Sequence, residues 1–363
     1  MKKKAINSLQ LGCLILCPVL SASIGIGLYN AIQIAGVDNY ISIFLSIFIG
    51  LIPLAMIIYI AKYKEDLNLI EKINNLYGKY LGTIINLFIV AIMFVIAITV
   101  LFNICNFIVT QFLSNTPILY VAIAFGIISF YAVSKGIETI SRTQLIFSFI
   151  IALIFIGLAI TLLPEFDTSN LKPFLENGLE KPVWTAILNV FTNVIPIFVI
   201  LIIPKNDIVD KHNYNKYVII FYFLAAFFIL AFSVFTMGVL GQYLSKFYQY
   251  PEYILLKRVS IFGFIDRIEN LLSFQWIFSC FATLTLIIYY ISNFIKKNDQ
   301  AKLIPFIITI IIIITSTYIF KNNTTFNSYV TNIYPYILSI LLIIMFIVCI
   351  TIFIKKKLIK IND

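Results

Sequence analysis

The chain has 363 residues, of which 61% are hydrophobic and 12% are charged, and its mean hydropathy is +1.01. Soluble domains are about half apolar and a quarter charged, so a soluble protein of this composition would expose large apolar patches and aggregate. The net charge of +10 does not indicate a nucleic-acid partner, because the basic residues lie in short clusters between apolar runs and form no basic module of the usual kind. The composition predicts an integral membrane protein surrounded by lipid.

Ten apolar runs are long enough to cross a bilayer as helices, which needs about 20 residues each. Backbone polar groups in lipid must be satisfied within the segment, so each run predicts a transmembrane helix. The sequence therefore predicts an all-α polytopic membrane protein with a single domain over residues 1–363. We expect spans near residues 9–34, 41–61, 81–111, 117–134, 143–163, 184–203, 217–242, 269–295, 303–320 and 335–354.

The opening residues imitate a signal peptide, because Lys2, Lys3 and Lys4 precede an apolar run. That run continues to Ile34 and is long enough to span, so we expect an uncleaved first helix. With the N-terminus inside, the cytoplasmic segments hold 19 of the 26 Lys and Arg residues and the outer segments hold seven. This bias predicts that both termini are cytoplasmic.

Ten spans divide into two halves, roughly 9–163 and 184–354. The polar linker after the second span, 62–79, carries apolar residues at helical spacing and predicts an amphipathic surface helix. The linker after the seventh span, 243–268, is comparably long and lies on the opposite side of the membrane. An inverted repeat of five plus five helices would place the two linkers in this way.

The first span is interrupted halfway by small and polar residues. Glycine permits an irregular backbone, and freed N–H groups beside a helix dipole form an anion site. We therefore predict a broken helix and a ligand site here, as in secondary transporters. Close helix packing at small residues is the alternative. The residues concerned are Ser21, Ser23, Ile24, Gly25 and Gly27.

The sixth span holds the matching position in the second half, where Asn189, Thr192, Asn193 and Pro196 interrupt an aliphatic run. Proline frees a backbone carbonyl, and the polar side chains can satisfy freed groups or a ligand. A kink capped by its own neighbours is the alternative. The run contains no glycine, so any unwound stretch is expected to be short.

Other polar residues inside spans are few. Asn103 and Asn106 share one face of the third span, and Ser279 lies in the eighth. These side chains either line a cavity or form hydrogen bonds between helices. We include all three in the candidate ligand site.

Ionisable residues are absent from the middle of every expected span, which disfavours proton-driven transport. The single histidine, His212, lies in a loop, and the sequence shows no cluster of catalytic or metal-ligating groups. The five cysteines all lie in apolar runs, where they act as small hydrophobes. The sequence thus predicts neither an enzyme nor a cofactor.

Three stretches resemble the spore germination permeases, the B subunits of endospore germinant receptors, a branch of the amino acid–polyamine–organocation superfamily. They are Ile24 to Gly27 followed by Ala35 to Tyr40; Tyr131 and Gly136 to Arg142; and Pro251 to Tyr253 with Phe264 to Glu269 and Trp276. In order and spacing the resemblance covers nearly the whole chain. Thr192 and Asn193 depart from the family pattern, in which many relatives have a small residue followed by an acid.

The resemblance implies a LeuT-like inverted repeat with broken first and sixth helices. It also implies a nutrient sensor in the spore inner membrane that assembles with an A subunit and a lipoprotein C subunit. Its ligand is expected to be an amino acid bound at mid-membrane between the two breaks. An amino-acid permease of the same fold is the alternative.

Four charged residues lie at predicted span ends, where they either anchor the interface or contact partner subunits. Glu138 and Arg142 are four apart and can pair on one helix turn, whereas Arg267 and Glu269 are two apart and cannot face each other in a helix.

Overall fold

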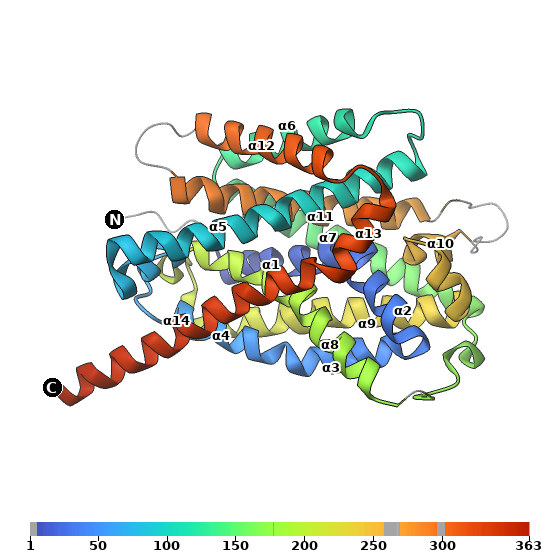
Figure 1. Cartoon of the computed structure of the whole chain (residues 1–363), viewed down its shortest axis with the longest axis horizontal. Coiled ribbons are helices and arrows are strands. Elements are labelled where there is room, and N and C mark those ends of the chain that lie inside the picture. Colours follow the sequence, from blue (N-terminus) through green and yellow to red (C-terminus); the bar gives the residue numbers. More distant parts are fainter. Residues whose placement is uncertain (1–5, 177, 258–266, 268, 296–301, 363) are drawn as a thin grey trace.

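The computed structural model describes the chain except residues 1–5, 177, 258–266, 268, 296–301 and 363. Its elements are helical, and most of them run along the long axis of the molecule (Figure 1). They are α1 (Ser8–Ala22), η1 (Ser23–Gly27), α2 (Leu28–Ala35), η2 (Gly36–Asp38), α3 (Asn39–Ile49), α4 (Leu51–Ala61), α5 (Leu69–Gln111), α6 (Ile118–Ser134), α7 (Ile137–Leu162), η3 (Leu163–Glu165), η4 (Thr168–Leu171), α8 (Glu180–Asn189), η5 (Val190–Val194), η6 (Ile195–Ile202), η7 (Lys205–Asp207), η8 (Lys211–Asn213), α9 (Tyr214–Phe247), α10 (Pro251–Leu256), α11 (Glu269–Ile295), α12 (Leu303–Ile319), α13 (Asn323–Asn332) and α14 (Tyr334–Asn362).

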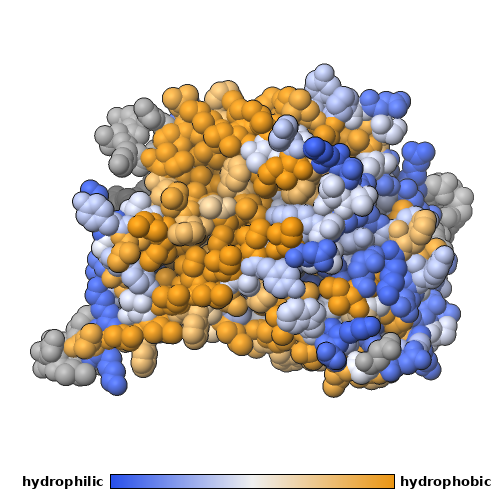
Figure 2. Space-filling view, in the orientation of Figure 1, coloured by the Kyte–Doolittle hydropathy of each residue, from blue (hydrophilic) through white to orange (hydrophobic). Residues whose placement is uncertain are grey.

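Seven helical segments in the described part of the chain are long and apolar enough to cross a membrane. One of them, Ser8–Ala61, has 54 residues and covers the first two expected spans, and two shorter apolar helices coincide with the fourth and ninth. Apolar side chains cover the middle of the molecule, and hydrophilic residues gather toward the two ends of its long axis (Figure 2). The chain is an integral membrane protein, as its composition predicts. The number of ten crossings and the division into repeats stay predictions.

The amphipathic linker helix expected after the second span forms the first turns of α5. Asn68 caps it, since its side chain accepts a hydrogen bond from the Glu71 N–H while Glu71 bonds the Asn68 N–H in return. The 43-residue helix is interrupted at Gly78, whose φ of +79° and ψ of 172° turn the chain from the linker helix into the third span.

Helix α1 lies at the centre of the bundle, packed against α7, α9 and α11 (Figure 1). From Leu11 to Ala22 every residue of α1 is buried, as expected of a helix that is hydrophobic all round. By contrast, α6 and α12 pair at the edge of the molecule (Figure 1). Gly126 permits this pairing, because a Cβ there would lie 2.4 Å from Ile313 Cδ1.

Contacts gather the start of α1, the linker after α4 and the loop after η6 at one end of the molecule. Ile6 forms a parallel bridge with Ile208, and the Ser8 N–H donates to Asp210 Oδ1 at 2.7 Å. Burial acts to raise the pKa of Asp210, but its hydrogen bonds with Ser8 outweigh burial and lower that pKa.

At the same end, Glu65 in the linker after α4 accepts hydrogen bonds from Lys205 at 2.5 Å and from Lys211 at 3.1 Å, both in the segment after η6. The Lys355 ammonium of α14 reaches the Asn75 carbonyl at 3.3 Å. The start of α1 and the end of α14 therefore lie on the same side of the molecule. This agrees with the predicted common side of the termini, whose assignment to the cytoplasm stays a prediction.

Replacing Glu65 by Gln is expected to lower the free energy of unfolding by about 1 kcal/mol at pH 7, the upper range for a partly exposed ion pair. The Lys205 hydrogen bond holds the pKa of Glu65 below its ordinary 4.5. Because the folded-state pKa is depressed, the stabilisation is complete above the unfolded pKa and is lost as pH falls through the folded pKa. Thermal unfolding of wild type and E65Q should therefore converge in acid.

The matched control for this prediction is Glu138→Gln, which removes an ion pair with Arg142 whose side chains are 50% and 67% exposed. A gap between wild type and E65Q that persists unchanged from pH 7 to pH 3.5 would contradict an electrostatic role of Glu65.

Candidate functional site

The first span is broken at its centre, as predicted. Ile24 has an extended backbone (φ −74°, ψ 129°) and Gly25 lies in the left-handed region (φ +68°, ψ −3°). All five residues of η1, from Ser23 to Gly27, are buried. Two residues with non-helical geometry release peptide groups from the helix ladder at a depth where water cannot satisfy them.

Asn103 of α5 partners one of these freed groups, because its Nδ2 donates a hydrogen bond to the Ile24 carbonyl at 3.0 Å. Its other atom, Oδ1, is buried without a hydrogen-bond partner among the described residues. That oxygen would lie 2.9 Å from a Cβ at Gly25. The structure thus brings Asn103 to the break and leaves one acceptor there.

The sixth span reaches the same place by a different local geometry. It is α-helical to Asn189, then has five residues of π-helix (η5) and eight of 3₁₀-helix (η6) around Pro196, and its backbone stays right-handed to Ile202. The helix type changes, but no residue unwinds as in the first span. The absence of glycine accounts for this difference, since no residue of this run adopts positive φ readily.

Asn193 of η5 faces Gly27, where a Cβ would lie 2.5 Å from the Asn193 Oδ1 atom. That oxygen is also buried without a hydrogen-bond partner in the described structure. Thr192 instead bonds back to the Leu188 and Asn189 carbonyls of its own helix. The contact with a glycine of the first break is made by Asn193, whereas Asn189 is buried at the end of α8 with its Nδ2 unpartnered in the described structure and Pro196 lies in the first turn of η6.

The hydroxyls predicted around the first break are largely engaged in their own surroundings. Ser23 donates to the Leu20 carbonyl at 2.9 Å, and Ser279 donates to the Gln275 carbonyl at 3.0 Å. Ser21 shares a 2.7 Å hydrogen bond with Thr283 of α11. These bonds join and cap helices, so they fit the packing alternative for these three serines.

The linker before the eighth span supplies residues that the sequence reasoning missed. The Tyr250 ring packs on Gly25, where a Cβ would lie 2.7 Å from its Cε1, and its hydroxyl accepts a hydrogen bond from Asn106 Nδ2 at 2.8 Å. Asn106 therefore belongs to the site through Tyr250. The ring also contacts Trp276 of α11, with ring centroids 5.5 Å apart, and Trp276 donates its indole N–H to the Ser21 carbonyl at 3.3 Å.

Glu252, in the first turn of the short helix α10, is 0% exposed. Its carboxyl faces the backbone N–H of Gly25, yet neither oxygen reaches hydrogen-bonding geometry with any described residue. The sequence reasoning searched for acids within spans and so overlooked one that enters the interior from a linker. The sequence signal for this acid is the Pro251-Glu252 pair, because proline is favoured at the first position of a helix and so predicts a helix start within the linker.

The charged span ends make no described hydrogen bond to the break, and two of them, Arg267 and Glu269, lie near Tyr253 of the linker beside it. Arg142 and Glu138 pair at 2.6 Å on an exposed helix turn, as their spacing allows. Arg267 is exposed with a φ of +65°, and Glu269 is buried as the first residue of α11. Phe264, Ile265, Asp266 and Ile268 of the resembling stretch lie outside the described residues.

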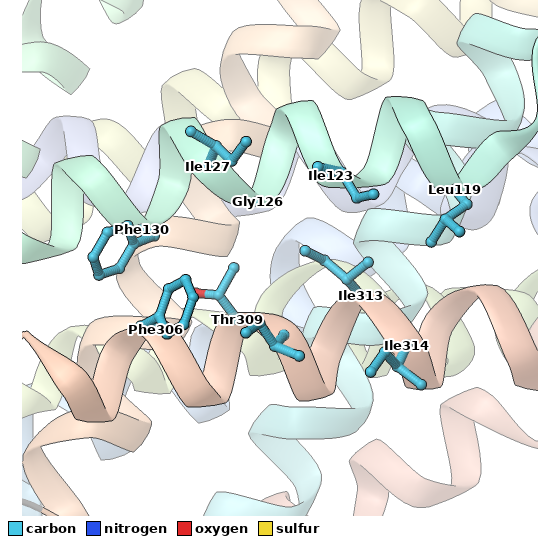
Figure 3. Close-up of a pocket in the computed structure, with 10 residues that line it drawn as sticks. Leu119, Ile123, Gly126, Ile127, Phe130, Phe306, Thr309, Ile313 and Ile314 are labelled. Atoms are coloured by element: carbon cyan, nitrogen blue, oxygen red, sulfur yellow. The ribbon is translucent and has the colours of Figure 1, made fainter.

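An apolar groove of about 390 Å³ lies between α6 and α12 (Figure 3). It is lined by aliphatic and aromatic side chains and by Thr309, whose hydroxyl already donates to the Pro305 carbonyl. The groove offers no free polar group to a charged ligand and lies at the edge of the bundle. The small cavity lined by Asn193 and Val19, of about 20 Å³, has room for one water molecule. The break itself is closed in this conformation, because Ser23 to Gly27 are buried and the Tyr250 ring packs on Gly25.

This chain is similar to known proteins over nearly its full length. Residues 5–324 match the family described as Spore germination protein. Spore germination protein KB of Bacillus subtilis is 25% identical over 84% of this chain and 82% of its own length. Spore germination protein XB of Bacillus anthracis is 23% identical over 73% of this chain and 74% of its own length.

Solved structures show the same fold at low identity. A manganese transporter of Eremococcus coleocola superposes with a TM-score of 0.66 and 12% identity, over 96% of this chain and 81% of its own. A Na⁺-coupled sialic acid symporter superposes with a TM-score of 0.63 and 12% identity, over 92% and 78%. These are LeuT-fold transporters, so the predicted fold class is confirmed.

Three glycine-to-alanine variants separate the two constraints on Gly25, which are its positive φ and the close approach of Tyr250 and Asn103. Gly178 and Gly157 serve as the comparison positions. Gly25→Ala adds both positive-φ strain and overlap with Tyr250 and Asn103, and we expect a loss of about 2–4 kcal/mol of unfolding free energy. Gly178→Ala, at φ +76° with open space around it, should lose about 1–2 kcal/mol from strain alone. Gly157→Ala, inside α7 with nothing within 4 Å, should gain about 0.5–1 kcal/mol. Thermal unfolding of the purified proteins measures the order. If Gly25→Ala melts with Gly178→Ala, Tyr250 and Asn103 do not hold the break.

Proposed function

The chain belongs to the spore germination protein family, and on this basis we propose that it is the B subunit of a spore germinant receptor that binds a small amino acid at the break of its first span. The observation that carries this proposal is the buried, non-helical stretch at Ile24 and Gly25. Packing alone does not require such a break at the centre of a buried helix, because each freed peptide group is costly there.

The break offers complementary groups to the two ends of an amino acid. The N–H groups at the start of α2, around Ile26 and Gly27, carry the positive end of a helix dipole and suit the ligand carboxylate. The unpartnered amide oxygens of Asn103 and Asn193 suit its ammonium group. Both oxygens face break glycines, so a zwitterion seated there would touch both halves of the chain.

Ligand entry requires a change of conformation, because Tyr250 and α10 cover the break. A ligand shifts the population toward an open state in proportion to its different affinity for the two states. In a receptor this shift is the signal, and it is passed to partner subunits. The proposed partners are an A subunit and a lipoprotein C subunit in the spore inner membrane, with both termini of this chain cytoplasmic. The exposed Glu138–Arg142 pair is a candidate contact with them.

An amino-acid transporter is the second candidate function. It is favoured by the fold, since the superposed solved structures are named as transporters. Fold alone does not decide function. In that case the same opening at α10 would alternate with one at the opposite end, where Glu65 pairs with Lys205.

Binding is tested by thermal stabilisation of the purified chain in lipid nanodiscs against the twenty common amino acids. A ligand at one hundred times its Kd stabilises the folded state by about 2.7 kcal/mol. Asn193→Ala should weaken this response at least tenfold. Asn332→Ala, on the exposed end of α13, should leave it unchanged. Absence of a response to every amino acid would refute the proposed ligand class.

Uptake separates receptor from transporter. We expect the chain alone in sealed vesicles to bind the amino acid found in the panel but not to accumulate it in radiolabelled form. Time-dependent accumulation above that of protein-free vesicles, released when the vesicles are permeabilised, would support the transporter instead.

A further inference from the structure

Glu252 is a buried acid with no partner of opposite charge in the described structure. It is 0% exposed, and both of its carboxyl oxygens lack hydrogen bonds. The described ion pairs join Arg142 to Glu138 and two lysines to Glu65, and none includes Glu252. A carboxylate buried without compensation is among the least favourable groups in a folded protein, so its position needs a reason.

Capping of its own helix does not supply that reason. An acid in the first turn is favoured by the helix dipole, but α10 has only six residues. Neither oxygen makes a capping hydrogen bond of good geometry to the N–H groups of that turn. Burial outweighs the nearby N–H groups of Glu252 itself and Gly25, and it raises the pKa of this linker carboxyl to about 8.

Among the residues that the structure describes, no positively charged group forms an ion pair with Glu252. On its own linker the Tyr250 hydroxyl bonds Asn106, and Lys257 points outward over the Tyr253 ring, 3.4 Å from Gln111. From α11 come Cys280, which lies near Tyr250, and the acid Glu269 near Tyr253. From α5 come the neutral Asn103 and Asn106. From α9, Lys246 lies against Gly36. Arg267, just before α11, is exposed and lies near Tyr253, without forming an ion pair with Glu252 in the described structure.

We propose that Glu252 is the cation-binding carboxyl of this site, which holds a proton while the site is closed and exchanges it for one positively charged group. That group is either the ammonium of an amino acid or a monovalent metal ion. The exchange conserves charge, because one cation enters as one proton leaves for solvent. The ammonium form of this inference rests on the proposed function, and it restricts the ligand to molecules that carry a positive charge.

The position of Glu252 fits this role. Its carboxyl faces Gly25, and the unpartnered Asn103 oxygen lies on the same residue of the break. Two oxygens of different side chains therefore converge on the peptide that interrupts the first span. The N–H groups at the start of α2 follow directly in the chain. An amino acid, whose two charges are adjacent, would place its ammonium toward α10 and its carboxylate toward α2.

The first test needs no ligand and uses the purified full chain in choline chloride. Because the folded-state pKa of Glu252 is raised, the stabilisation that it gives is complete below the unfolded pKa and lost as pH rises toward the folded pKa. The Tm of the isosteric, neutral Glu252→Gln variant should therefore rise relative to wild type between pH 5 and pH 8 and then stay level. Glu180→Gln, an exposed acid in the first turn of α8, should show no such trend.

The second test identifies the cation. Wild type and E252Q are titrated with Na⁺, with K⁺, with each of the twenty amino acids, and with the carboxylic acids that lack only the amino group, such as propionate for alanine. A cation that binds Glu252 should stabilise wild type, bind at least tenfold more weakly to E252Q, and release about one proton per ion bound at pH 6.5 in calorimetry in two buffers. The deaminated acids should give no response.

The outcomes separate this inference from the proposed function. Amino acids that bind wild type and E252Q equally, without proton release, would overturn the role of Glu252 and leave amino-acid sensing intact. A response to Na⁺ or K⁺ that E252Q loses, with no response to any amino acid, would support the cation site and sink the amino-acid proposal. If no cation of either kind depends on Glu252, the inference is wrong.

Discussion

The structure depends on one constraint, the left-handed backbone of Gly25 at the centre of a buried helix. Once the helix ladder is interrupted there, the peptide groups on either side need partners that lipid cannot provide. Asn103 supplies one by donating to the Ile24 carbonyl, and the linker helix α10 covers the other side with Tyr250 and Glu252. The third span, the linker and the eighth span therefore pack around the point where the first span lacks helical backbone hydrogen bonds. A ligand that took over these groups would compete directly with the contacts that close the site.

The first and sixth spans interrupt their α-helices in different ways. In the first half, glycine allows a true break with one residue at positive φ. In the second half, the chain passes from α- to π- to 3₁₀-helix around Pro196 and keeps a right-handed backbone. The second half therefore contributes a side chain, Asn193, where the first contributes bare backbone. A site built in this way has rigid peptide dipoles on one side and an adjustable amide on the other.

Much of this architecture follows from hydropathy alone. The expected run 269–295 coincides with α11, and 117–134 matches α6 within a residue, because lipid enforces length and composition on each span. The glycines of the first span also predicted their own break. The partners of the break were less predictable. Asn103 was one of several intramembrane amides with equal claim, and its bond to Ile24 depends on how two helices pack. Glu252 lay in a polar linker, where an acid is ordinary, and only the folding of that linker back into the bundle makes it exceptional.

The bond between Ser8 and Asp210 joins residues 202 positions apart, and the Ile6–Ile208 bridge lies beside it. This has a consequence for biosynthesis. When the ribosome has delivered the first five spans, the opening helix is already in the bilayer, but its start is untethered. Asn193 and Glu252 have yet to be made. The nascent chain thus carries a break that Asn103 can partner but that Tyr250 and Glu252 do not yet cover, and the insertion machinery must shelter it until the second half arrives. Quality control of this protein is expected to act on that half-made state.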